Sequence, residues 1–127
     1  MKGIVAQGGD ITNQDGTGGV SIYGERFDDE QIWYTHTHKG VLSTANEGPN
    51  TNGSQFLICF CPVPHLNFKH TVFGRVISGY DFIEKIEDTA TDQNDFPEKP
   101  VTIVDCGELL KDDKLTEETA DFLEYYK

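Results

Sequence analysis

The segment from Asn46 to Ile58 decides how this chain is interpreted, and it reads Asn-Glu-Gly-Pro-Asn-Thr-Asn-Gly-Ser-Gln-Phe-Leu-Ile. Its glycine, proline and asparagine residues set or tolerate unusual backbone angles, so its first part predicts a loop. The apolar end has the composition of a strand. The segment therefore puts the amide side chains of Asn46 and Gln55 at the two ends of one loop. Amide groups beside an apolar wall suit the backbone of a peptide better than a charged metabolite.

Patterns along the rest of the chain predict a mainly β protein with two helices. The predicted strands are 41–45, 55–61, 71–77 and 101–105, the last from its alternating pattern. A helix is predicted over 80–87, because Phe82, Ile83 and Ile86 fall at helical spacing. A second helix is predicted in the tail, where Thr116 is a suitable N-cap.

Length and charge limit the classes of function. The 127 residues predict one domain, and the formal net charge of −12 disfavours binding to nucleic acid. Residues 81–127 hold 15 acidic and 5 basic side chains, a net charge of −10. This surplus predicts a solvated surface, with a docking surface for a basic partner as the alternative.

The cysteine count and the hydropathy indicate the cellular compartment. Cys59, Cys61 and Cys106 are an odd number, and the first two point the same way in a predicted strand, which disfavours a relaxed disulfide. Reduced thiols and the lack of a secretory leader pattern predict a cytoplasmic or nuclear protein. No apolar run approaches the roughly 20 residues that cross a bilayer, so no membrane partner is expected.

Several long motifs, in order, strongly resemble the cyclophilins, a family of peptidyl-prolyl cis-trans isomerases. The resemblance covers about residues 3 to 109 and rests on the segments 7–10, 16–25, 40–46, 48–56, 69–76 and 101–109. It implies an antiparallel β-barrel with capping helices. Residues 1–109 would form the cyclophilin-like domain, and residues 110–127 an acidic helical extension.

The resemblance also implies that the N-terminal strands of the family's barrel are missing from this sequence. Missing strands would leave exposed sheet edges, which invite a strand-exchanged oligomer, association with a partner, or poor folding. The family's principal catalytic donor is an arginine in a Phe-His-Arg segment upstream of the matched region. We therefore name no catalytic residue in this chain.

Substrate-binding roles follow from the resemblance at nine positions. Gln7 and Gln55 would bind the peptide or orient neighbouring groups. Ala45 and Asn46 would line the groove, with the backbone of Asn46 pairing to the substrate. Leu66 and His70 would belong to the proline pocket. Three further positions differ from the usual aromatic residues of the family, namely Ile4, Leu57 and His65.

The implied activity is the isomerisation of X-Pro bonds in proline-containing peptides or proteins, which assists protein folding. This chemistry needs no metal, cofactor or nucleophile, because a site can act by binding the twisted transition state more tightly. Cyclosporin-type inhibitors would bind weakly, because His65 replaces the usual tryptophan. The alternatives are a module that binds proline peptides without turnover, and an interaction protein that recruits a partner through its acidic C-terminal half.

Other residues that attract attention have plainer interpretations. His36 and His38 form a His-x-His pair without clustered third and fourth ligands, so they are interpreted as surface or loop histidines. The stretch from Gly16 to Gly24 lacks the ending of a phosphate-binding loop and is interpreted as an ordered loop. Cys59 and Cys61 are interpreted as small buried apolar residues.

Overall fold

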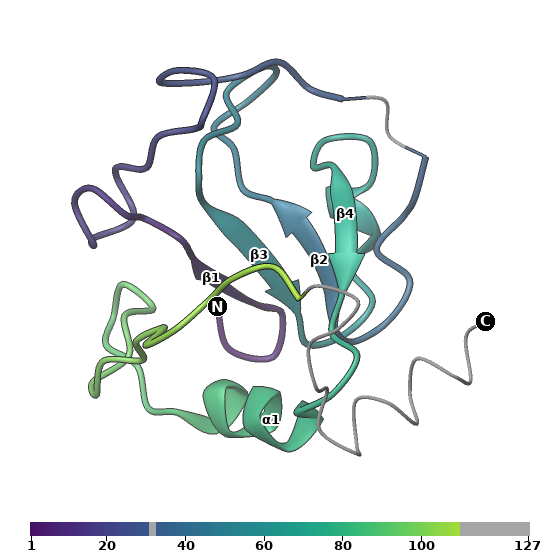
Figure 1. Cartoon of the computed structure of the whole chain (residues 1–127). Helices are drawn as coiled ribbons and strands as arrows, with labels where there is room; N and C mark the ends of the chain where they lie inside the picture. Colours follow the sequence, from purple (N-terminus) through teal and green to yellow (C-terminus); the bar gives the residue numbers. More distant parts are fainter. Residues whose placement is uncertain (31–32, 110–127) are drawn as a thin grey trace. The chain divides into compact units, whose positions relative to one another are not determined.

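The computed structural model describes residues 1–30 and 33–109 (Figure 1). Its residues fall into two compact units, Met1–Val76 and Ile77–Lys127. The predicted helical extension over 110–127, including its cap at Thr116, lies outside the described residues.

The first unit is built on a four-stranded antiparallel sheet (Figure 1). Its strands are β1 (Val5–Gly8), β2 (Val41–Thr44), β3 (Phe56–Cys59) and β4 (Val72–Arg75). The order β1-β3-β2-β4 puts β3 and β2 in the centre and leaves β1 and β4 at the edges. The predictions of a mainly β antiparallel fold and of strands within 41–45, 55–61 and 71–77 are confirmed.

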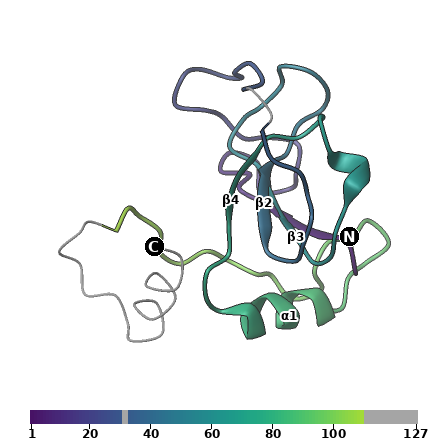
Figure 2. The same cartoon turned by 90° about the vertical axis from the view of Figure 1, so that its right-hand side faces the viewer.

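The core of this unit lies on one face of the sheet. Alternation along the strands buries Val41, Leu57 and Cys59, and neighbouring strands place Val5 directly opposite Cys59. The segment after β3 closes this face with Val63 and the short 3-10 helix η1 (Pro64–Leu66). Figure 2 shows the strands nearly edge-on, with η1 to one side of them.

The second unit contains one helix, α1 (Tyr80–Asp88), which confirms the helix predicted over 80–87. Gly79 precedes it with a φ of 78°, a left-handed conformation that glycine adopts without a steric penalty. Ile83 is the buried residue of α1. Asp81 lies in the first turn, where a negative charge favours the helix dipole, and it pairs with Lys85 at 3.9 Å.

The prediction of a strand over 101–105 is wrong. This segment has no strand pairing, and Ile103 and Val104 are 61% and 94% exposed. Alternating β-branched residues show that a segment is able to form a strand, but a ladder also needs a neighbouring strand with free hydrogen-bonding groups. In the described residues, the 101–105 segment forms no ladder with any strand.

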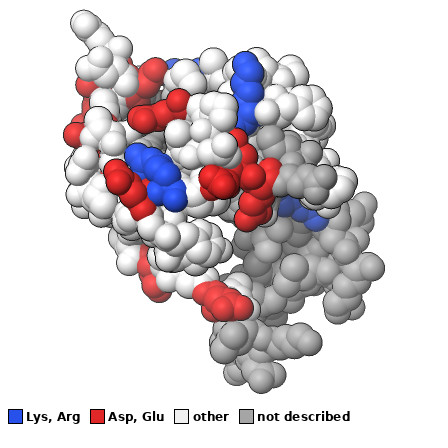
Figure 3. Space-filling view, turned by 90° about the horizontal axis from the view of Figure 1, so that it is seen from above, with Lys and Arg blue, Asp and Glu red and all other residues white. Residues whose placement is uncertain are grey.

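The acidic surface and the free cysteines agree with the expectations from the composition. Figure 3 shows acidic side chains around isolated Lys or Arg side chains on one face, with no continuous basic patch there. Cys59, Cys61 and Cys106 are free thiols. Within the part of the chain that the structure describes, no helix has the length and hydropathy needed to cross a bilayer.

Candidate functional site

A small cleft of about 90 Å³ lies beside the Gln7 and Gln55 side chains, and we call it the amide cleft. Four of the nine predicted binding residues line it. Its full lining is Gln7, Gly16, Gly18, Arg26, Ala45, Asn46, Glu47, Thr51, Gly53 and Gln55. The loop from Asn46 to Gln55 therefore forms one wall of the cleft.

The two glutamines are directly hydrogen-bonded, because antiparallel pairing of β1 with β3 brings them together. Gln7 lies opposite Leu57 in the ladder, and Gln55 immediately precedes β3. Gln7 Nε2 donates to Gln55 Oε1 at 2.7 Å. The Nε2 of Gln55 donates to the carbonyl oxygens of Gly16 and Gly18, at 2.9 and 2.7 Å.

Ala45 and Asn46 follow the end of β2 and continue the wall of the cleft. The Ala45 N–H donates to the Gln55 carbonyl at 3.0 Å, which joins the two ends of the loop. Asn46 Nδ2 donates to the Lys69 carbonyl at 2.8 Å. In the described part of the chain, the backbone N–H and carbonyl of Asn46 have no hydrogen-bond partner, so both remain available to a ligand.

Four of the predicted residues meet in the apolar core beside the cleft. Ala45 and Leu57 are 8% and 5% exposed, and the partly buried Ile4 and Leu66 pack against the same cluster. Leu57 is central because β3 pairs on both sides. Ile4, Leu57 and Leu66, three of the predicted binding residues, therefore belong to one apolar cluster.

The two remaining predicted residues are histidines in or near η1. His70 Nδ1 lies 2.9 Å from the Thr44 carbonyl oxygen; because a carbonyl only accepts, Nδ1 carries the hydrogen. This bond ties His70 to the end of β2 and leaves Nε2 as an acceptor. His65 lies in η1 and is exposed, without a described contact to the other predicted residues.

Sequence reasoning missed several residues of the amide cleft. Gly16, Gly18 and Gly53 contribute backbone, and Arg26, Glu47 and Thr51 contribute side chains. Arg26 Nη1 donates to the Gly19 carbonyl at 2.8 Å, so its guanidinium holds the glycine-rich loop. The glycine-rich stretch is interpreted from the sequence as an ordered loop. Its composition does not show that its carbonyls accept hydrogen bonds from the Gln55 side chain.

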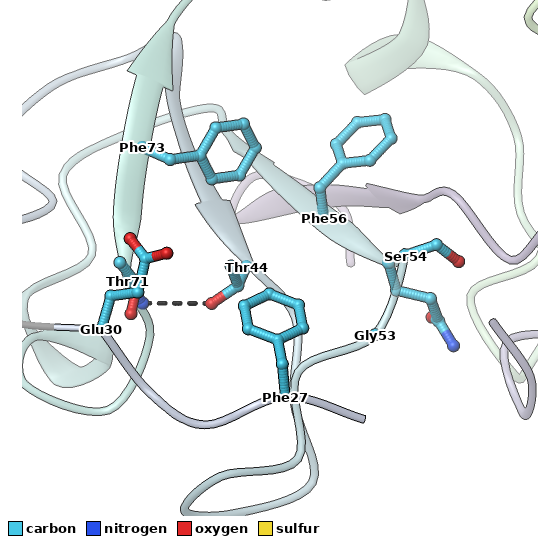
Figure 4. Close-up of a pocket in the computed structure, with 9 residues that line it drawn as sticks. Phe27, Glu30, Thr44, Gly53, Ser54, Phe56, Thr71 and Phe73 are labelled. Atoms are coloured by element: carbon cyan, nitrogen blue, oxygen red, sulfur yellow. Dashed lines mark hydrogen bonds between the residues drawn. The ribbon is translucent and has the colours of Figure 1, made fainter. Parts of the chain in front are cut away.

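A larger cleft of about 250 Å³ shares Gly53 and Gln55 with the amide cleft, and we call it the aromatic cleft. Figure 4 shows rings from Phe27, Phe56 and Phe73 around it, with Thr44 hydrogen-bonded to the Thr71 N–H at 3.1 Å. Phe73 is 59% exposed. This cleft contains one predicted residue, Gln55, and lacks the paired amides, so the amide cleft is the better candidate site.

The His-x-His pair does not form a metal site in the described residues, where no group of three potential ligands gathers. Both histidines lie in a loop, as interpreted from the sequence; His38 is exposed, whereas His36 is buried and only 1% exposed. His36 is held by Asn67, whose Oδ1 accepts from its backbone N–H at 2.8 Å and from Nδ1 at 2.9 Å. A two-residue motif does not reveal this contact across 31 residues.

The Cys59 thiol is not suited to a nucleophilic role. Cys59 is fully buried, as predicted, whereas Cys61 is partly exposed. Burial, with the neighbouring Cys61 as a second cause, raises the pKa of Cys59 to about 11. The Cys59 thiol is therefore protonated at neutral pH and acts as a small apolar residue.

Comparison with known proteins gives a consistent result. Residues 1–108 match the family described as cyclophilin type peptidyl-prolyl cis-trans isomerase/CLD. Peptidyl-prolyl cis-trans isomerase D from Mycosarcoma maydis is 53% identical over 110 residues, which cover 87% of this chain and 28% of that protein. Peptidyl-prolyl cis-trans isomerase cyp11 from Rhizopus delemar is 51% identical, over 87% of this chain and 32% of that protein.

A solved structure shows the same fold. The crystal structure of a cyclophilin-type peptidyl-prolyl cis-trans isomerase from Cryptosporidium parvum superposes with a TM-score of 0.74 at 40% identity. The match covers 78% of this chain and 63% of that one. The chain thus spans about a third or less of the two curated relatives, and less than two thirds of this solved structure.

Proposed function

Because this chain belongs to the family of cyclophilin-type peptidyl-prolyl cis-trans isomerases, we propose that it binds proline-containing peptides and isomerises their X-Pro bonds during protein folding. The observation that carries this proposal is the hydrogen-bonded pair Gln7–Gln55 beside the apolar cluster of Ile4, Leu57 and Leu66. One part offers polar groups to a peptide backbone, and the other offers apolar surface to a proline ring.

The geometry supports action by differential binding rather than by covalent chemistry. Rotation about an X-Pro bond breaks amide resonance, and no bond to the protein has to form. The unpaired backbone groups of Asn46 are suited to fix the chain on one side of the proline. The proline ring would rest against Leu57 and Leu66 while the preceding peptide group turns.

The test is exchange NMR on an Ala-Pro peptide with the purified chain. We expect the cis and trans signals to exchange faster than in the uncatalysed reaction, which takes tens to hundreds of seconds. A double change, Gln7→Ala with Gln55→Ala, should reduce the enhancement. An uncatalysed rate at high protein concentration would reject isomerase activity for this chain.

A second candidate is a module that binds proline peptides without turning them over. Among the described residues, Arg26 supplies the guanidinium that lines the amide cleft. Its Nη1 donates hydrogen bonds to the carbonyls of Gly19 and Glu25. A donor that is held in this way is poorly placed to follow the twisting prolyl nitrogen. Saturable binding of the Ala-Pro peptide without enhanced exchange would favour this candidate over the isomerase.

Three finer proposals concern partners and location. A cyclosporin-type inhibitor should bind weakly, since His65 offers less apolar surface than a tryptophan. The edges of β1 and β4, each paired on one side in the described residues, favour a strand-exchanged oligomer. The three free thiols favour a cytoplasmic or nuclear location.

Each finer proposal has a direct measurement. Light scattering across a concentration series should show dimers at high concentration, and monomers throughout would contradict strand exchange. Isothermal titration with cyclosporin should give a dissociation constant far above that of a tryptophan-bearing family member. A fluorescent fusion of the full-length gene product should stain cytoplasm or nucleus, and staining of a secretory organelle would contradict the location.

A further inference from the structure

The segment from Asp10 to Gly19, here called the 10–19 loop, is wrapped around one carboxylate. Both oxygens of Asp10 accept hydrogen bonds from backbone N–H groups of the loop. Oδ1 accepts from Thr12 and Asn13 at 3.1 and 2.9 Å, and Oδ2 from Asp15, Gly16 and Gly18 at 3.2, 3.0 and 3.0 Å. Five donors that converge on one side chain set the path of the whole loop.

Close packing shows that the loop is built around this carboxylate. A Cβ at Gly18 would lie 2.6 Å from Asp10 Oδ1 and would also clash with Thr12 Oγ1. Glycine is therefore required for the close approach. The pKa of the Asp10 carboxyl agrees with this arrangement. Partial desolvation raises it, but the hydrogen bonds from the loop N–H groups together outweigh this effect and keep the pKa well below its ordinary value.

The two glycines that donate hydrogen bonds to Asp10 also accept hydrogen bonds from Gln55, a residue of the amide cleft. Gly16 and Gly18 direct their N–H groups to Asp10 and their carbonyls to Gln55 Nε2. Both hydrogens of the Gln55 amide are thus used, which orients Gln55 Oε1 toward Gln7 Nε2. Gln7 must then donate to Gln55, and this leaves Gln7 Oε1 as the acceptor that the pair can offer to a ligand.

We propose that Asp10 is a positioning residue of the amide cleft: it sets the carbonyls of Gly16 and Gly18, and through them the orientation of Gln55 and Gln7. This inference rests on the proposed function, because it assigns the orientation of the amides that would meet a proline peptide. Asp10 itself does not line the cleft.

The chain offers a matched control in the same loop. Asp15 accepts from the N–H and hydroxyl of Thr17, at 3.0 and 2.6 Å, and from neither glycine that holds Gln55. Asp10→Asn and Asp15→Asn each remove one negative charge from the loop. A difference between the two variants therefore reports on the hydrogen-bond network and not on net charge.

The experiment measures the side-chain amide signals of Gln55 and Gln7 by ¹⁵N NMR, and the affinity for an Ala-Pro peptide by titration. In Asp10→Asn we expect both amide signals to shift or broaden and the affinity to fall roughly tenfold, as for the loss of about one oriented hydrogen bond. In Asp15→Asn we expect the signals to stay in place and the affinity to remain within about twofold of wild type.

The outcomes separate the two proposals. Unchanged amide signals in a folded Asp10→Asn variant would overturn the positioning role, whatever the peptide does. A wild-type chain that binds no proline peptide would overturn the proposed function, while the amide signals still decide the role of Asp10. If Asp10→Asn does not fold, Gly18→Ala crowds the same carboxylate oxygen and should produce the same displacement of the Gln55 signal.

Discussion

At the scale of single residues, the first unit depends on a few buried polar contacts that join distant parts of the chain. His36 is the largest of the side chains that are more than 98% buried. Because Asn67 Oδ1 accepts from it, Nδ1 carries the hydrogen, and the buried Nε2 has no partner in the described residues. Protonation of His36 would leave a buried N–H⁺ without an acceptor, which is costly.

This contact predicts a pH-dependent stability. Burial lowers the pKa of His36 below its ordinary 6.5, the Asn67 hydrogen bond opposes the shift, and the nearby histidines add to it. The unfolded chain then takes up a proton first, so the free energy of unfolding should fall as the pH drops below about 6.5 and level off below the folded pKa. Urea titrations from pH 7.5 to 5 measure this dependence.

The variant His36→Gln should flatten this pH dependence, whatever its effect on stability at pH 7.5, because glutamine does not titrate. His38→Gln changes an exposed side chain outside the contact and should keep the wild-type dependence. An equal slope in wild type and His36→Gln would show that another group is responsible.

His65 carries a second prediction at this scale. It is exposed on η1, where a larger ring meets no steric obstacle from burial. His65→Trp should tighten the binding of a cyclosporin-type inhibitor by roughly tenfold, through about 1–2 kcal/mol of added apolar contact. Isothermal titration measures the change. An affinity equal to that of the wild type would place the inhibitor away from η1.

At the scale of elements, β3 joins the core to the amide cleft. It pairs with β1 on one side and β2 on the other, and its inward residues Leu57 and Cys59 are buried. The loop before it ends at Gln55, so the position of the cleft follows from the strand register. A shift of one residue would turn Leu57 out of the core and move Gln55 away from Gln7.

The variant Leu57→Ala should therefore lower both stability and binding. We expect a loss of about 2–5 kcal/mol in the free energy of unfolding, from lost burial and the cavity that remains. Ile22→Ala removes a similar side chain that is 92% exposed, and should cost less than about 0.5 kcal/mol. Chemical denaturation of both variants measures the difference, and a similar loss in both would contradict a core role for Leu57.

At the scale of the whole molecule, charge sets which partners are excluded. The net charge of −12 repels the phosphate backbone of nucleic acids, and Figure 3 shows no continuous basic patch on the visible face. An acidic surface does not release the counterions that are bound to a nucleic acid. It therefore lacks the gain in free energy that drives most nonspecific binding.

The chain should accordingly fail to bind nucleic acid even at low ionic strength. Fluorescence anisotropy of a labelled 20-base duplex at about 50 mM salt should stay constant up to high protein concentration. A short basic peptide in the same assay tests the acidic surface as a docking site. Saturable binding of the duplex would contradict the prediction from charge.

The sequence by itself determined the antiparallel β character, three of the strands, helix α1, and the placement of Asn46 and Gln55 at the two ends of one loop. These features follow from local composition and from long motifs, which act over a few residues. The failed strand at 101–105, the burial of His36, and the grip of Gly16 and Gly18 on Gln55 were decided only by the tertiary structure. Each depends on whether a partner lies within hydrogen-bond distance across tens of residues, and local patterns do not carry that information.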